Sequence, residues 1–185
     1  MNDSELSVKY PERGVNYFLA ALIFSVFTSL NAFAGTPGQV KKKPARLFII
    51  GGGDRTELLM RELLSFSGLQ PAGYVVVLPM ASEEPDSAVV YLQEDFKLVG
   101  ITRVVGMNFR EGETISPERI DSLKAARLIF ISGGDQTRFM KAVGRGAVYQ
   151  AIHDACRNGT VIAGTSAGAA VMSKKMITGN SLKYP

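Results

Sequence analysis

The segment from Gly164 to Gly168 has the pattern G-x-S-x-G, with one serine held between glycines that allow a tight turn. An apolar run at 160–163 precedes it, and a helix-forming run at 169–173 follows it. A strand, a tight turn and a helix in this order form a nucleophile elbow, which presents the serine hydroxyl at the end of the strand. We therefore expect Ser166 to act as a nucleophile. The alternative is a glycine-rich turn without chemistry.

A second glycine turn, Gly133-Gly134-Asp135-Gln136, follows the apolar run 128–131. If a backbone N–H of this turn faces Ser166, it can form an oxyanion hole together with the N–H of Ala167. The alternative is a structural turn in which Asp135 caps the next helix.

A third glycine turn, at 51–53, follows the apolar run 47–50. It does not match the dinucleotide fingerprint G-x-G-x-x-G, because Glu57 stands at the third glycine position. Asp54 and Glu57 instead fit the capping box of a helix. We expect the turn to close the rim of the site, with Gly53 lining the substrate pocket.

A serine nucleophile normally needs a general base within hydrogen-bond reach. The only histidine of the sequence, His153, falls within a helical pattern that leads into the fifth apolar run and is expected to lie away from the site. Lys174 and Lys175 are close in sequence to Ser166, but nothing else supports a Ser–Lys pair. Cys156 has the helical spacing of a small core residue.

Five short apolar runs alternate with helical patterns, which predicts a parallel sheet covered on both faces. The expected fold is a doubly wound, three-layer α/β sandwich. Ligands bind beyond the carboxyl ends of the strands in such sheets. The glycine turns at 51–53, 133–134 and 164–168 all follow strands, so we expect them to meet at one rim. The expected strands are 47–50, 74–78, 101–107, 128–131 and 160–163, and the expected helices are a first one with Leu58, Leu59, Leu63 and Leu64 on one face, then 88–99, 117–126, 136–143 and 147–157.

The composition fits one globular domain, with 46% hydrophobic residues and a net charge of +4. The basic residues are scattered, which does not favour nucleic-acid binding. Residues 1–34 have the basic start, apolar run and Ala32-Phe33-Ala34 ending of a signal peptide. We expect export to the periplasm or the medium without a permanent membrane span, and a basic linker at 35–45.

From residue 46 onward the chain resembles the cyanophycinase and peptidase E family of serine peptidases. The resemblance rests on the segments 48–53, 129–136 and 163–170, and the tail 171–179 is similar to the cyanophycinase branch. It implies a flavodoxin-like fold similar to class I glutamine amidotransferases. It also implies Ser166 as nucleophile, the N–H groups of Gly134 and Ala167 as oxyanion hole, Gln136 and Asp135 in the substrate pocket, and no metal or other cofactor.

The resemblance also bears on substrates and assembly. Cyanophycinases cleave a poly-aspartate backbone that carries arginine on its side chains and release β-Asp-Arg dipeptides, whereas peptidase E relatives cleave after an N-terminal aspartate. The implied partner is therefore a poly-aspartyl-arginine or peptide substrate, and a homodimer is the implied assembly.

The chain departs from the family pattern in one respect. The family's catalytic histidine follows the nucleophile, and no histidine follows Ser166 here. We therefore expect residues 46–185 to be a C-terminally truncated catalytic domain, inactive or nearly so. The missing strands predict an unpaired sheet edge and exposed apolar surface.

Three other functions remain open at this point. A non-catalytic binding protein would keep the pocket without the base. A glutaminase-like amidotransferase is disfavoured because its nucleophile is cysteine. A nucleotide-binding α/β module would require the glycine turn at 51–53 to hold phosphate.

Overall fold

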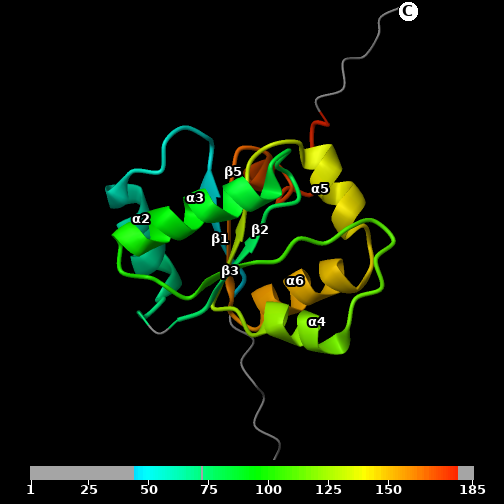
Figure 1. The fold of residues 1–185 in the computed structure, drawn as a ribbon, viewed down its shortest axis with the longest axis horizontal. Helices are drawn as coiled ribbons and strands as arrows, with labels where there is room; N and C mark the ends of the chain where they lie inside the picture. The colour runs from blue at the N-terminus through cyan, green and yellow to red at the C-terminus, as the bar shows by residue number, and fades with distance from the viewer. Residues whose placement is uncertain (1–43, 72, 179–185) are drawn as a thin grey trace, which may run out of the picture. The chain divides into compact units, whose positions relative to one another are not determined.

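The computed structural model describes residues 44–71 and 73–178. The predicted signal peptide and most of the predicted linker lie outside the described residues. The described part contains one parallel five-stranded sheet in the order β1-β5-β4-β2-β3 (Figure 1). Its strands are β1 (Arg46–Ile50), β2 (Val75–Leu78), β3 (Val104–Gly106), β4 (Leu128–Ile131) and β5 (Val161–Thr165).

Helices cover both faces of this sheet, so the predicted doubly wound α/β fold is confirmed. One face packs against α2 and α3, and the other against α4, α5 and α6 (Figure 1). Strands β2, β4 and β5 are buried along their whole length, which explains their continuous apolar sequence. The helices are α2 (Glu57–Ser67), α3 (Pro85–Leu98), α4 (Pro117–Lys124), α5 (Gln136–Val143), α6 (Ala147–Arg157) and α7 (Ala167–Ala170).

The first helix differs from its prediction at the cap and at one position of its buried face. Thr56, and not Asp54, is the N-cap, and its side chain accepts a hydrogen bond from the Leu59 N–H. Met60 and Leu63 are buried, whereas Leu58 is 69% exposed. Leu59 and Leu64 are partly buried against the same core, so of the predicted core positions only Leu58 is wrong.

The boundaries of other helices and strands differ from the predicted boundaries by a few residues. Helix α3 begins at Pro85, three residues before its predicted start, because proline is well tolerated in the first turn. Strand β3 is shorter than the predicted 101–107, since only Val104–Gly106 pairs with β2. Helix α4 ends at Lys124.

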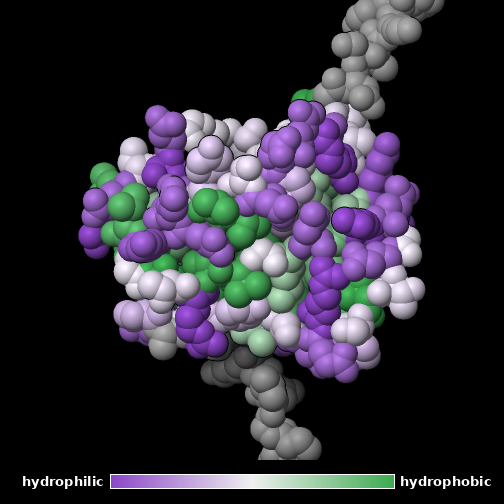
Figure 2. Space-filling model, viewed as in Figure 1, coloured by the Kyte–Doolittle hydropathy of each residue, from purple (hydrophilic) through white to green (hydrophobic). Residues whose placement is uncertain are grey.

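The sheet has apolar surface at its outer strands, as the sequence predicted. Within the described residues β1 pairs only with β5, and its Leu47 and Ile49 are 42% and 64% exposed. Figure 2 shows apolar residues also gathered on the face crossed by α3, and Val90 and Leu98 of that helix are exposed. In the part of the chain that the structure describes, no helix is long and apolar enough to cross a membrane.

Candidate active site

Ser166 occupies a strained turn between β5 and α7. Its φ of 51° and ψ of −114° make it the one non-glycine residue with positive φ among those described. Such backbone strain at a serine between strand and helix is typical of a nucleophile elbow. The Ser166 N–H donates a 3.0 Å hydrogen bond to the Ile50 carbonyl at the end of β1, and the residue is exposed. The predicted strand, turn and helix are therefore present, with the hydroxyl available to a substrate.

The two glycines of the motif allow the elbow to pack closely. A Cβ on Gly164 would lie 2.5 Å from the Gly168 carbonyl oxygen. A Cβ on Gly168 would overlap the Ile131 carbonyl and lie 2.8 Å from the Ser132 carbonyl oxygen. Because these neighbours are backbone atoms, no rotamer change relieves the overlap. The absence of a Cβ at these glycines thus allows α7 to pack closely against the end of β4, where the second glycine turn begins.

That second turn lies directly against Ser166. A Cβ on Gly133 would be 3.5 Å from the Ser166 Cβ, which is ordinary van der Waals contact. Gly134 has a φ of 134°, and a Cβ there would overlap the Ala81 carbonyl group. The Asp135 N–H donates to the same Ala81 oxygen at 2.8 Å. The predicted meeting of the 133–134 and 164–168 turns at one rim is thus confirmed.

Two backbone N–H groups of these turns were predicted to form the oxyanion hole, a role that stays a prediction. Within the described residues, neither the Gly134 N–H nor the Ala167 N–H donates a hydrogen bond to another group. Ala167 is the first residue of α7, so its N–H has no partner within the helix. Unpaired donors beside a serine hydroxyl are what acyl transfer requires, because they stabilise the negative charge of the tetrahedral intermediate.

Asp135 caps helix α5. Its Oδ1 accepts hydrogen bonds from the Thr137 N–H at 2.6 Å and the Arg138 N–H at 3.2 Å. The Arg138 and Thr137 N–H groups, aided by the Arg138 guanidinium, hold the pKa of Asp135 below its ordinary value. The capping role left open by the sequence is therefore present. The substrate-binding role of Asp135 stays a prediction and would involve the other carboxylate oxygen.

Asp135 should add stability that depends on pH. Since its pKa is lower in the folded than in the unfolded protein, the contribution is complete above the unfolded-state pKa and is lost as pH falls through the folded-state pKa. We expect Asp135→Ala to lower Tm at pH 7, with the difference from the parent disappearing in acid. Asp135→Asn should keep most of the cap but not the pH dependence. Thermal melts between pH 7 and pH 2.5 check this, and a constant difference for Asp135→Ala over that range would contradict it.

Gln136, predicted to bind substrate, makes contacts within the chain itself. Its Nε2 donates to the Ile177 carbonyl at 2.8 Å, and the Thr137 Oγ1 donates to the Thr178 carbonyl at 3.3 Å. The segment after α7 therefore folds back against the start of α5. A substrate that uses the Gln136 amide would have to displace this segment.

The turn at 51–53 is exposed and uncrowded. Gly52 and Gly53 have φ of 143° and 81°, and an added Cβ would have no atom within 4 Å at either position. The turn follows Ile50, which is in register with Thr165 just before the elbow. It therefore lies at the predicted rim, while the contact of Gly53 with substrate stays a prediction.

The structure does not bring His153 to the elbow. His153 lies on α6, about two turns from the start of that helix at Ala147, and is exposed. Its ring packs on Tyr149, with ring centroids 4.3 Å apart. Cys156 is half-buried and packs against the core, as expected. Among the described residues, no group of three or more His, Cys, Asp or Glu is arranged to hold a metal ion.

The sequence did not predict two features near the rim. Ser132 is 4% exposed, and its Oγ has no hydrogen-bond partner among the described residues. The Arg138 guanidinium donates to the Ala81 carbonyl and to Glu83, both at 3.0 Å. The signal for Ala81 and Glu83 was their place just beyond the carboxyl end of β2, where a doubly wound sheet binds ligands.

With this geometry in view, comparison with known proteins is informative. Residues 47–185 match the model of Peptidase family S51, and the chain belongs to that family. Among curated relatives, the chain is similar to a cyanophycinase of Nostoc sp., with 34% identity over 136 residues. A cyanophycinase of Thermosynechococcus vestitus is 29% identical over 140 residues. These alignments cover 71% and 72% of this chain but 46% and 44% of the relatives, so the chain spans about half of their length.

Solved structures agree on the fold. A peptidase from an acI-B1 Actinobacterium has a TM-score of 0.55 at 21% identity, over 70% of this chain and 57% of the other. A Listeria monocytogenes EGD-e protein described as a peptidase E has a TM-score of 0.56 at 21% identity, over 69% and 61%. At this identity the likeness concerns the fold alone.

Proposed function

We propose that this chain carries the nucleophile of a serine peptidase that cleaves next to aspartyl residues. The observation that carries the proposal is the strained Ser166 turn packed against the Gly133–Gly134 turn. In the proposed reaction the Ser166 Oγ attacks the carbonyl carbon and gives its proton to a base. The Gly134 and Ala167 N–H groups hold the oxyanion, and the leaving amine takes up a proton as the acyl-enzyme forms. Water then hydrolyses the ester.

The proposed substrate is cyanophycin or a β-aspartyl peptide. The names of the curated relatives support this choice, and the chain shares their family. Hydrolysis of an α-aspartyl dipeptide is the variant that a peptidase E function would give. Export by the 1–34 segment and assembly as a homodimer belong to the same proposal.

The base is proposed to be a group other than His153. The sequence has one histidine, and α6 holds it in an exposed stack with Tyr149. A serine at its ordinary pKa is a weak nucleophile, so these 185 residues alone should turn over peptide slowly. Added imidazole should accelerate the reaction, because it can reach the exposed Ser166 and accept its proton.

Incubation with three substrates in imidazole buffer tests the substrate proposal. We expect slow release of β-Asp-Arg from cyanophycin and little cleavage of an α-aspartyl dipeptide, both measured by mass spectrometry. Cleavage of the α-aspartyl dipeptide alone would favour a peptidase E function. A neutral tripeptide is the control, and equal cleavage of all three substrates would contradict aspartyl specificity.

The position of His153 favours a second candidate, a binding protein that retains the pocket without turnover. It predicts saturable binding of cyanophycin fragments with no acyl-enzyme at Ser166. Detection of that acyl-enzyme by intact mass, with or without imidazole, would exclude this candidate.

A further inference from the structure

Arginine residues gather at the end of the sheet where its strands begin, opposite the elbow. Arg46 is the first residue of β1, and Arg127 and Arg103 immediately precede β4 and β3. The register of β2 with β4 and with β3 places Tyr74 between Arg127 and Arg103. The Cα atoms of these two arginines are therefore about 10 Å apart at the usual interstrand spacing. We call Arg46, Arg103 and Arg127 the arginine cluster.

Two guanidinium groups of the arginine cluster converge on the last turn of α2. Arg46 donates hydrogen bonds to the Phe66 carbonyl at 2.7 Å and to the Ser67 carbonyl at 3.3 Å. A Cβ on Gly68 would lie 3.7 Å from the Arg127 Nη2. Among the described residues, neither Arg46 nor Arg127 forms an ion pair with a carboxylate. Two cations held beside the same helix end, without a carboxylate, favour an anion from outside the chain.

The third arginine and the helix ends extend this basic surface. The Arg103 guanidinium lies 5.9 Å from the centroid of the Tyr74 ring, and the residue is exposed. A helix that joins two parallel strands ends at the edge where the next strand begins. The last turns of α3, α4 and α6 carry one cation each, namely Lys97, Lys124 and Arg157. The last two are paired with carboxylates of their own helices, so the arginine cluster supplies most of the unbalanced charge.

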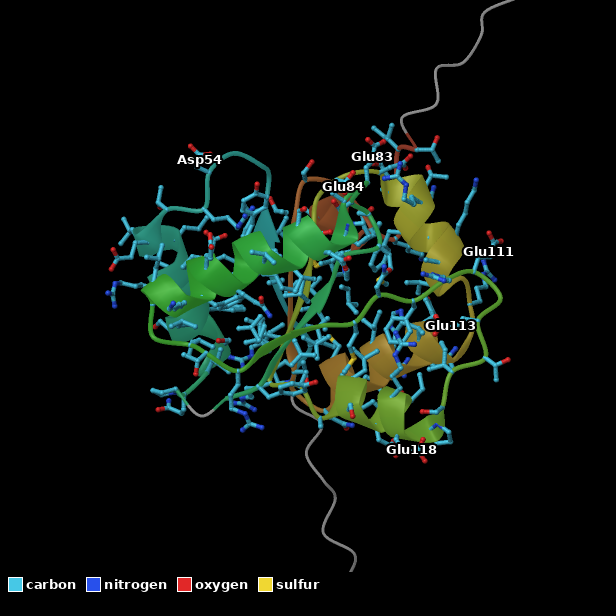
Figure 3. The ribbon with its side chains drawn as sticks, in the orientation of Figure 1. Asp54, Glu83, Glu84, Glu111, Glu113 and Glu118 are labelled. Carbon is cyan, nitrogen blue, oxygen red and sulfur yellow. The ribbon has the colours of Figure 1, made fainter. Side chains whose placement is uncertain are left out.

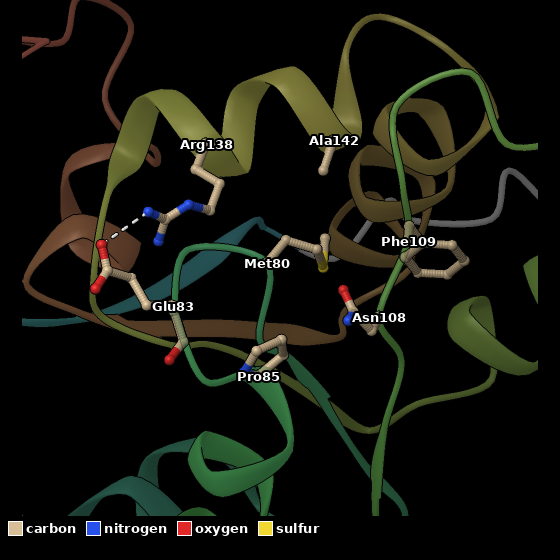
Figure 4. A pocket seen from close by; sticks show the side chains of 8 residues that line it. Met80, Glu83, Pro85, Asn108, Phe109, Arg138 and Ala142 are labelled. Atoms are coloured by element: carbon tan, nitrogen blue, oxygen red, sulfur yellow. Dashed lines mark hydrogen bonds and ion pairs between the residues drawn. The ribbon is translucent and has the colours of Figure 1, made fainter.

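The opposite end of the sheet is acidic. Figure 3 shows Asp54, Glu83 and Glu84 where the strands finish. Arg138 lies at that end too, but it is paired with Glu83 at 3.0 Å (Figure 4). Positive and negative side chains are thus separated along the strands, although the whole sequence has a net charge of only +4. Such a separation orients the domain toward a negatively charged surface.

Exposed apolar side chains lie beside the arginine cluster. Phe66 is 39% exposed, with its ring centroid 5.4 Å from the Arg46 guanidinium. Leu47, the second residue of β1, and Leu98, the last residue of α3, are 42% and 66% exposed. Cations beside exposed Phe and Leu are typical of surfaces that lie against lipid headgroups. A nucleic-acid backbone would bind the arginines but leave the apolar side chains in water.

We propose that the arginine cluster docks this domain onto an anionic lipid bilayer. Lipid phosphate groups accept hydrogen bonds from Arg103 and Arg127, and the side chains of Phe66 and Leu98 enter the headgroup region. The sequence that leads into β1 carries three consecutive lysines at 41–43, which adds charge of the same sign. This inference does not depend on the proposed peptidase function. In this orientation the elbow faces away from the bilayer, and Ser166 stays open to substrate.

Vesicle sedimentation of the full chain tests the docking surface. The vesicles are phosphatidylcholine alone and a two-to-one mixture of phosphatidylcholine with phosphatidylglycerol. We expect tighter binding to the mixture, and Arg103→Gln combined with Arg127→Gln should weaken that binding about tenfold or more, since each cation near an anionic surface contributes several-fold. Arg103→Lys combined with Arg127→Lys should retain most of it. Arg46 is kept because it bonds the end of α2.

Lys174→Gln combined with Lys175→Gln is the matched control. These exposed lysines follow α7 near the elbow, so the same charge is removed from the other end of the sheet. The control should bind the anionic vesicles within about twofold of the parent, because only cations near the bilayer contribute. Thermal melts should show an unchanged fold for both double variants, since all four side chains belong to exposed residues.

Four outcomes would overturn the proposal. The first is equal binding of the parent to the two kinds of vesicle, and the second is an equal loss of binding in the glutamine variant and the control. The third is arginine-dependent binding to duplex DNA that is tighter than binding to the anionic vesicles, which would assign the cluster to nucleic acid. The fourth is release from the vesicles by inorganic phosphate at constant ionic strength, which would indicate a site for a single phosphate ion.

Discussion

Replacing Ser166 with alanine is expected to abolish the imidazole-stimulated part of the rate at which this chain hydrolyses an activated aspartyl ester. The reason is that the alanine variant has no oxygen to form the acyl-enzyme, whereas the elbow and both N–H donors remain. An activated ester is the right substrate because its leaving group departs without protonation, so imidazole needs only to accept the Ser166 proton. The release of 4-nitrophenol, with and without imidazole, measures the effect.

Two controls make this result specific to Ser166. His153→Gln should retain the parent rate, because the His153 ring lies on α6 against Tyr149 and not at the elbow. Intact-mass spectra should show an acyl adduct in the parent and none in Ser166→Ala. Equal ester hydrolysis by parent and alanine variant would rule out Ser166 as the nucleophile.

Replacing Gly168 with alanine should be strongly destabilising. The new Cβ would overlap the Ile131 carbonyl and lie 2.8 Å from the Ser132 carbonyl oxygen. Helix α7 and the end of β4 would have to separate, at a cost of about 3 kcal/mol. For a chain of this size that corresponds to a fall in Tm of roughly 10 °C.

Gly51→Ala is the matched control for that experiment. Gly51 has an ordinary φ, and an added Cβ there meets no atom within 4 Å. Its Tm should therefore stay close to the parent value. A Gly168→Ala protein that melts within a degree or two of the parent would show that the elbow does not depend on this close contact. Differential scanning calorimetry on both variants is sufficient.

The fold was largely predictable because the sequences of the strands indicate burial on both faces of the sheet. Runs such as 128–131 are apolar at every position, and only a sheet covered on both faces buries every residue. The cap of α2 was wrongly predicted for a local reason. Asp54 and Thr56 are both good caps, and nothing in the local sequence chooses between them.

The site was predictable to the extent that backbone shape defines it. Glycines at 134 and 168 mark places where a Cβ does not fit, and sequence shows glycines directly. Contacts made by flexible side chains across the rim were not visible in this way. The Gln136 amide bonded to Ile177, and Arg138 bonded to Glu83, join positions 41 and 55 residues apart. Neither pair has a local pattern.

The hydrogen bond from the Ser166 N–H to the Ile50 carbonyl ties the proposed nucleophile to β1, an outer strand of the described sheet. Outer strands open more often than central ones, since fewer neighbours hold them in place. Each local opening of β1 would release the turn that keeps Ser166 at positive φ, while β2, β4 and β5 stay folded. Ser166 would therefore lose its position at the lower opening free energy of an outer strand and not at that of the core. Warming would disable the elbow before the domain melts.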